Sequence, residues 1–335
     1  MFVALLVLAA CQTATPAPVG PKPVPTAGPM DLPGSLVFPS GNKLFALEIA
    51  SMERRVLAEF PVGTILGAPT VSRDGAQIVF TVYKAPTDPK QIGGSDLYVV
   101  PVAGGSPTLL LEHDGEGASL AEPIWSPDGQ RVYFTNRAVH TSTDATVEES
   151  QIERINRDGS GREVIVQDAT SPSLSADGQL LSYIVPANGQ EATSLWVASA
   201  DGQQPRQLVG PEFTEIAAPR FAPGGSQIVF SAVGGPTNAP KQAQRPTIAP
   251  LTALLLPGRA EAHGIPWDLW LVAPDGSGLA QLTDVGEDGP VATWSPDGSW
   301  IAIAGEMGIY LVDVQSQSIV MLAPEYTGSL AWIPE

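Results

Sequence analysis

The hydrophobic and polar positions of this chain follow one pattern that recurs five times. In each copy a short apolar run leads into a turn resembling Ser-Pro-Asp-Gly, and a second run then alternates apolar and polar residues. Alternation with a period of two puts one face of a strand into a core, and Asp-Gly favours a tight reversal. Each copy therefore predicts a β-hairpin, and the first strands are expected to end at Val71, Trp125, Leu174, Phe221 and Trp294.

A second hairpin pattern follows the first. Residues 96–100, 194–198 and 268–272 share a Leu-aromatic core, and each leads into a glycine-containing turn and another short apolar run. Each unit thus supplies four strands. The turn glycines stand roughly 50 residues apart, except for a last interval of about 73, and four strands in ~40–50 residues are typical of a propeller blade.

The two ends of the repeat region complement each other. Residues 35–60 contain three strand patterns without a first strand, whereas residues 329–334 contain a lone first strand, in which Trp332 and Pro334 match Trp294 and Pro296. Pairing of these ends would close a ring and hide its edges. We therefore expect an all-β, six-bladed β-propeller of four-stranded antiparallel blades, closed in blade one by the N- and C-terminal strands. Four, five or seven blades are the alternatives.

These motifs resemble the WD-repeat-like units of the TolB-type propeller family. The resemblance rests on the Ser-Pro-Asp-Gly hairpin followed by Asp-Leu-Trp/Tyr-Val, and it covers about residues 34–335. It implies an exported six-bladed propeller that binds partners through its rim or central funnel. Similar blades form the non-catalytic propeller of prolyl-oligopeptidase-like peptidases. The fourth copy departs from the pattern at Gly224, where Asp is expected, so the hydrogen bonds of that turn are in question.

The amino terminus resembles an export signal. Residues 1–10 are small and apolar, too short a run for a helix that spans a bilayer in ~20 residues. Leu8-Ala9-Ala10-Cys11 resembles the lipobox of bacterial lipoproteins, although no Lys or Arg precedes it. We expect a signal peptide at 1–10, lipidation of Cys11, a proline-rich tether at 12–33 and the propeller at 34–335. A buried amino-terminal strand with a core cysteine is the alternative.

Composition narrows the classes of function. The net charge of −18 repels phosphate backbones, so we expect no nucleic-acid partner. The 34 glycines and 33 prolines fit many turns and argue against long helices. Cys11 is the single cysteine, which excludes structural disulfides and cysteine-rich zinc sites within one chain.

Motifs of catalysis are missing from the sequence. It contains neither the Gly-x-Ser-x-Gly elbow of α/β-hydrolases nor the His-Glu-x-x-His pattern of zinc peptidases. The three histidines, His113, His140 and His263, are far apart, and we expect each to be a solvated loop residue. No catalytic residue, cofactor site or metal site is therefore predicted.

The acidic turns and the aromatic residues have structural interpretations. Asp284–Gly289 comes nearest to a calcium loop, but Gly286 and Ser295 stand where that loop needs oxygen-rich ligands, so we expect an acidic turn into blade six. We expect turn roles for Asp74, Asp128, Asp177 and Asp297. We expect core packing between blades for Trp125, Trp196, Trp270 and Trp294.

Two insertions interrupt the repeat. Residues 138–150 lengthen the hairpin of blade three with a polar, acidic segment, and residues 234–266 lengthen blade five. The second insertion contains the apolar residues Leu254, Leu255 and Leu256. Exposure of such a stretch is costly, so it either packs on a propeller face or contacts a partner.

The sequence as a whole favours a non-enzymatic binding or scaffold propeller. We expect a monomer, lipid-anchored on the outer side of a bacterial membrane in the periplasm or at the cell surface. It would engage an envelope protein or a small ligand through its funnel and the loop at 234–266. The alternatives are a propeller hydrolase or lyase with a site in the central channel, the propeller of a peptidase-like protein without its catalytic domain, and a purely structural domain.

Overall fold

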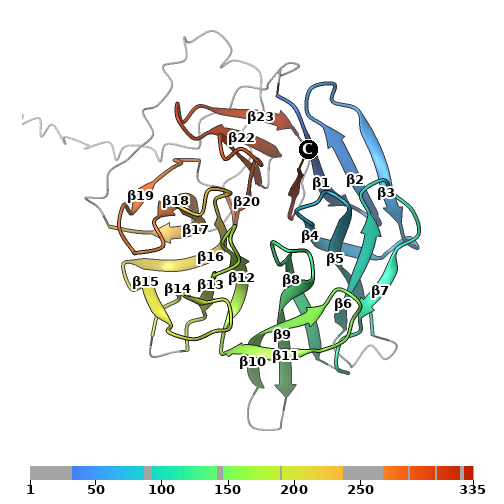
Figure 1. Ribbon diagram of the computed structural model, residues 1–335, viewed down its shortest axis with the longest axis horizontal. Coiled ribbons are helices and arrows are strands. Elements are labelled where there is room, and N and C mark those ends of the chain that lie inside the picture. Colours follow the sequence, from blue (N-terminus) through green and yellow to red (C-terminus); the bar gives the residue numbers. More distant parts are fainter. Residues whose placement is uncertain are drawn as a thin grey trace, which may run out of the picture.

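The computed structural model describes residues 32–86, 93–115, 117–141, 146–188, 191–236, 267–285, 287–305, 308–324 and 328–334. In these ranges the chain forms six four-stranded antiparallel sheets, which are arranged as blades around a common centre (Figure 1). The predicted all-β, six-bladed propeller is confirmed. None of the described segments forms a helix with the length and apolar character needed to cross a bilayer.

Each blade runs from an innermost strand at the centre to an outermost strand at the rim. Blade one contains β24 (Ala331–Ile333), β1 (Ser35–Ser40), β2 (Lys43–Glu48) and β3 (Arg54–Glu59). Blade two contains β4 (Ile65–Val71), β5 (Gln77–Lys84), β6 (Gly94–Pro101) and β7 (Thr108–Leu111). Blade three contains β8 (Ala118–Trp125), β9 (Arg131–Thr141), β10 (Thr146–Asn156) and β11 (Glu163–Gln167). Blade four contains β12 (Thr170–Leu174), β13 (Leu180–Val185), β14 (Ser194–Ser199) and β15 (Arg206–Val209). Blade five contains β16 (Phe213–Phe221), β17 (Ile228–Gly234), β18 (Asp268–Val272) and β19 (Ala280–Gln281). Blade six contains β20 (Val291–Trp294), β21 (Trp300–Ala304), β22 (Ile309–Asp313) and β23 (Ile319–Ala323).

The two ends of the propeller meet in blade one. β24 pairs with β1 in antiparallel register, with Leu36 opposite Trp332. Without β24, the inner edge of β1 would expose unpaired backbone groups. The predicted closure of the ring by its terminal strands is therefore confirmed.

The Ser-Pro-Asp-Gly turns share one hydrogen-bond pattern. In blade three the Ser126 hydroxyl donates to the Asp128 carboxylate, and that carboxylate accepts from the backbone N–H of Gln130 at 3.0 Å. The same bonds recur at Asp74, Asp177 and Asp297, which confirms their predicted turn roles. The fourth copy has Ala222 and Gly224 at the serine and aspartate positions, yet its backbone bond from Gly225 to Ala222 is kept at 2.8 Å. That turn folds without the side-chain bonds.

The hydrophobic core lies between neighbouring blades. One cluster joins Val37 and Leu44 of blade one to Ile78 and Phe80 of blade two, and comparable clusters fill the other interfaces. Among the predicted packing aromatics, Trp125, Trp270 and Trp294 are buried, whereas Trp196 is only partly buried.

Strand order gives the ring two unequal faces. Because the strands of a blade alternate in direction, the Ser-Pro-Asp-Gly turns and the turns between third and fourth strands share one face, here called the turn face. The connections between second and third strands share the other face with the connections between blades, here called the loop face. The described ends of both predicted insertions belong to the loop face. Residues 138–141 and 146–150 extend the paired strands β9 and β10, and residues 234–236 continue from the end of β17, whereas 142–145 and 237–266 lie outside the described residues.

Candidate functional site

Six innermost strands surround the centre of the ring. β24, β4, β8, β12, β16 and β20 contact one another in succession, so side chains from different blades meet there (Figure 1). Each of these strands begins at the loop face, where the connections are longest. Polar groups at these beginnings lie at the loop-face end of the ring's centre, which is here called the funnel mouth.

Four of the innermost strands carry a bulge at the same place. The residues before the repeat prolines have left-handed backbones, with φ between 45° and 55°, and they are Ala68, Glu122, Ser171 and Ala218. The register of each strand against its neighbour shifts at these residues. Non-glycine residues adopt this conformation at a cost, and bulges commonly redirect side chains beside functional sites.

Glu122 is the charged residue in this set, and its carboxylate is held firmly. It accepts from the Thr135 hydroxyl at 2.8 Å and from the N–H and hydroxyl of Ser171 at 2.9 Å each. Arg137 lies 3.4 Å from the same carboxylate. Because Ser171 belongs to the next blade, these bonds join blades three and four.

A cavity of about 330 Å³ opens beside Glu122. Blades three, four and five contribute to it, and its lining combines carboxylates, hydroxyl groups, one guanidinium group and small apolar side chains. The lining residues are Glu122, Arg137, Glu148, Ser150, Thr170, Ser171, Ile184, Pro186, Ala187, Thr193, Glu215, Ile216 and Ala217. This volume is within the usual range of small-ligand pockets, roughly 300–1,000 Å³.

Arg220 of β16 adds a positive charge near the centre of the ring. Its guanidinium group donates to the backbone carbonyl of Pro219 at 2.8 Å. Burial lowers the pKa of Arg220 from its ordinary value, and the charge of Glu122 opposes that shift. Glu122 and Arg220 belong to the inner strands of blades three and five, which lie on either side of blade four.

A second cavity of about 430 Å³ lies on the loop face of blades one and two. Its lining is more apolar and includes Phe60, Val62, Tyr83 and Tyr98. Val62 is 96% exposed, and Ile65 beside it is 62% exposed. Large apolar side chains at such exposure often mark contact surfaces.

A family model of the TolB beta propeller domain matches residues 38–238. The chain belongs to the TolB beta-propeller family. This match confirms the family resemblance that the repeat motifs indicated. The blades that line the first cavity all begin within the matched region.

Solved structures share the fold of this TolB-family propeller at low sequence identity. TolB from Acinetobacter baumannii matches with a TM-score of 0.63 and 13% identity over 90% of this chain and 67% of that one. A nidogen/laminin complex matches at 0.61 and 12% over 89% and 98%, and an oligogalacturonate lyase in complex with manganese matches at 0.52 and 19% over 84% and 74%. A comparison with curated protein sequences gave no match. One architecture therefore serves both enzymes and other proteins.

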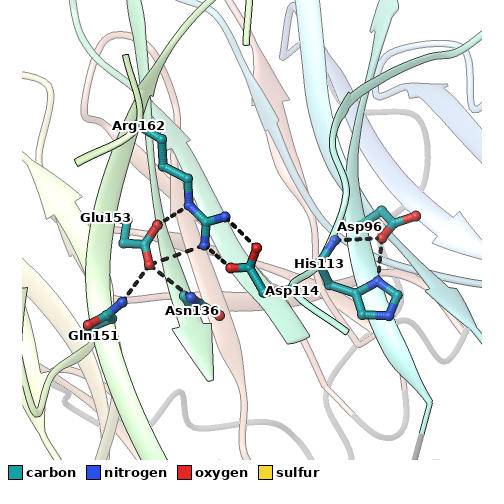
Figure 2. A network of polar contacts seen from close by, with 7 residues as sticks. All are labelled: Asp96, His113, Asp114, Asn136, Gln151, Glu153 and Arg162. Atoms are coloured by element: carbon teal, nitrogen blue, oxygen red, sulfur yellow. Dashed lines mark hydrogen bonds and ion pairs between the residues drawn. The ribbon is translucent and has the colours of Figure 1, made fainter. Parts of the chain in front are cut away.

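The prediction that His113 is a solvated loop residue is wrong. Its ring Nδ1 lies 2.5 Å from the Asp96 carboxylate, and its backbone N–H donates to the same oxygen at 3.0 Å (Figure 2). Asp96 is fully buried and also pairs with Lys84 at 2.6 Å. The far edge of the ring packs on the Gly94 backbone, where an added Cβ would come within 2.5 Å of Nε2. His113 thus fixes the loop after β7.

A second polar network continues from the same loop. Arg162 donates to Asp114 in blade two and to Glu153 in blade three, and Glu153 also accepts from Asn136 and Gln151 (Figure 2). Burial alone would lower the pKa of Arg162, but its bonds to Glu153 and Asp114 outweigh burial and raise it. These bonds clamp blade two to blade three.

The segment considered for calcium has other contacts. The Ser295 hydroxyl donates to Asp297 at 2.6 Å in the turn of blade six. Glu287 is buried beside Tyr310, and the pKa of Tyr310 is raised by burial and also by Glu287. Gly286 lies outside the described residues. In the described ranges, no group of three or more His, Cys, Asp or Glu residues is arranged to hold a metal ion.

Several predicted site residues lie outside the described part of the chain. They are Cys11, Leu254, Leu255, Leu256 and His263. His140 belongs to strand β9, but its side chain is outside that part as well. Lipidation and the role of the leucines therefore stay predictions.

The polar residues at the funnel mouth were missed by the sequence analysis. Aligned copies place Ala68, Glu122, Ser171 and Ala218 at one position before a repeat proline. A charged residue at a position that holds alanine or serine in the other copies was a usable signal. Thr170, Thr193 and Glu215 carried no such signal, because only folding brings them together.

Proposed function

We propose that this TolB-family propeller is a non-enzymatic binding or scaffold protein of the cell envelope. It engages a protein partner or small ligand through the mouth of its funnel and the insertion at 234–266. The observation that carries the proposal is the contrast between the two faces. Both cavities, the described ends of both insertions and the exposed Val62 and Ile65 belong to the loop face, whereas the other face carries the short repeated turns.

The leucines of the insertion give a direct test. The full chain and a variant with Leu254→Ala, Leu255→Ala and Leu256→Ala are each used to capture proteins from membrane fractions. We expect the variant to lose most of the captured partner while its thermal unfolding is unchanged, because the leucines supply apolar contact area. Equal capture by both chains would contradict a role for this loop.

Residues 1–33 complete the proposal. The segment 1–10 acts as a signal peptide, Cys11 receives the lipid, and the proline-rich segment 12–33 holds the propeller away from the outer face of the membrane. Proline-rich segments favour extended conformations, which suits a spacer. Labelling with a radioactive fatty acid tests this: the native chain should carry label and Cys11→Ala should not, whereas label on both chains would refute the anchor.

One observation favours a second candidate function, a propeller hydrolase or lyase. Glu122 and Arg220 place an acid and a cation near the centre of the ring, and one solved structure with this fold is an oligogalacturonate lyase. The test is an assay of oligogalacturonate cleavage by the native chain and by Glu122→Gln. Cleavage that the variant loses would establish the enzyme, and absence of cleavage by the native chain would reject this substrate.

A further inference from the structure

The cavity beside Glu122 contains polar groups that the described protein does not satisfy. Thr170 and Thr193 line it, and they are only 7% and 6% exposed. Among the described residues neither hydroxyl has a hydrogen-bond partner. The buried Nε of Arg137 also lacks one there. Buried polar groups are usually paired, so the two hydroxyl groups are available to accept hydrogen bonds from a ligand.

The charges of the cavity favour a cation. Glu122, Glu148 and Glu215 line it against the single guanidinium group of Arg137. Arg137 lies beside Glu122, whereas Glu148 and Glu215 are exposed at the rim and pair with no cation in the described ranges. The rim thus presents two unpaired carboxylates in a chain whose net charge is −18, which raises the local concentration of cations.

The remaining lining suits an aliphatic stem. Ile184, Pro186 and Ile216 stand beside the carboxylates and hydroxyl groups. A chain of several methylene groups can bury its length on such side chains while its charged end reaches an acid, as long basic side chains do on protein surfaces. A bare metal ion would gain nothing from these apolar contacts.

We propose that this cavity binds an aliphatic cation, an alkylammonium or guanidinium group carried on a short methylene chain. The charged group pairs with Glu148 and Glu215, and the hydroxyl groups of Thr170 and Thr193 complete its hydrogen bonds. A lysine or arginine side chain of a partner and a free diamine share this chemistry. The inference rests on the proposed binding function and specifies what the funnel mouth recognises.

Calorimetric titration of the full chain with three probes tests the ligand class. The probes are Nα-acetyl-lysine amide, cadaverine and the neutral analogue Nα-acetyl-norleucine amide. We expect at least one cation to bind, more weakly at higher ionic strength, and the neutral analogue not to bind. Tighter binding of the lysine amide identifies a protein side chain as the source, and tighter binding of cadaverine identifies a free amine. Failure of both cations, or equal binding of the neutral analogue, overturns the proposal.

Substitutions then locate the site. Glu148→Gln and Glu215→Gln should together weaken binding about tenfold, as expected when charge-assisted hydrogen bonds are lost. Glu53→Gln, an exposed change in blade one, should leave it unchanged. Thr193→Val should weaken binding without lowering the melting temperature, because its hydroxyl has no partner to lose in the free protein. Binding that neither the rim variants nor Thr193→Val affects would overturn the assignment.

The outcomes separate this inference from the broader proposal. Suppose that the native chain captures a partner through the loop face, and that the double variant Glu148→Gln, Glu215→Gln captures the same partner equally well. If the double variant also binds the cationic probes with the affinity of the native chain, only the inference fails. If cations bind as described and no partner is captured from membrane fractions, the broader proposal fails instead.

Discussion

At the scale of single residues, one turn repeats with a missing pair of side chains. In four of the five copies, an aspartate such as Asp128 accepts hydrogen bonds from a serine hydroxyl and a backbone N–H. The remaining copy, the fourth along the chain, has Ala222 and Gly224 at these two positions. The backbone of Gly224 is not left-handed, and nothing lies within 4 Å of a Cβ added there. This copy can therefore accept the missing side chains.

Restoring the pair should stabilise the protein. The variant Ala222→Ser, Gly224→Asp gains the turn hydrogen bonds and loses the extra freedom of glycine in the unfolded chain, together about 1 kcal/mol. Denaturant unfolding measures the gain. The matched opposite change, Asp128→Ala, should cost a similar amount, and a loss of stability in the restored variant would contradict the account of the turn.

Asp96 should make stability depend on pH. Burial would raise the pKa of its carboxyl, but hydrogen bonds from Lys84 and His113 outweigh burial and hold it below its ordinary value. A carboxyl whose pKa is lower in the folded state stabilises the protein above its unfolded pKa of ~4, and the contribution is lost as pH falls through the folded pKa. Thermal unfolding between pH 6 and the acid limit measures this.

The comparison is with two asparagine variants. Asp96→Asn should be less stable near neutrality and should lose less stability in acid than the native chain. Asp168→Asn, an exposed change after β11, should keep the native pH dependence. Identical acid curves for Asp96→Asn and the native chain would show that this carboxyl is not the cause.

Residue roles were predictable from the sequence where they repeat. The turn aspartates recur in register, so their function followed from the pattern. The pair of Asp96 and His113 is not repeated in other blades, and its two residues are 17 positions apart. The sequence around them therefore does not predict that they form a buried pair. Thr170 and Thr193 are a similar case, because the cavity that they line forms only when blades three, four and five have packed together.

At the scale of elements, the closure of the ring depends on a three-residue strand. β24 pairs with β1, and Trp332 is buried in a cluster with Leu36 and Phe38. Strand ends and blade order followed from the alternation of apolar positions, because every blade faces the same packing problem. The bulges did not, since a left-handed residue before proline leaves no mark on hydrophobic alternation.

Loss of Trp332 should weaken that closure. Trp332→Ala should reduce the free energy of unfolding by about 3–5 kcal/mol, the usual cost of removing a buried tryptophan. Size-exclusion chromatography should also detect larger species, because an opened ring exposes the edge of β1. Trp300→Ala, on the partly buried side of the same cluster, should cost less, and equal effects of the two would argue against a special role for β24.

At the scale of the whole molecule, the ring presents one plain face and one elaborate face. Its fold, blade number and family were predictable from the sequence, because repetition supplies the same information several times. The contents of the funnel mouth were not, since Glu122, Glu148 and Glu215 come from two separate blades and share no motif.

Binding through the loop face is the central claim, and blocking each face in turn tests it most directly. Cys11 is the single cysteine, so a Cys11→Ser chain can carry one new cysteine, either Val62→Cys on the loop face or Gln130→Cys on the turn face. Each is coupled to a bulky polyethylene glycol maleimide, and capture from membrane fractions is compared with the uncoupled chains. We predict that coupling at position 62 abolishes capture and that coupling at position 130 leaves it unchanged; the reverse pattern, or no effect at either face, would contradict the account.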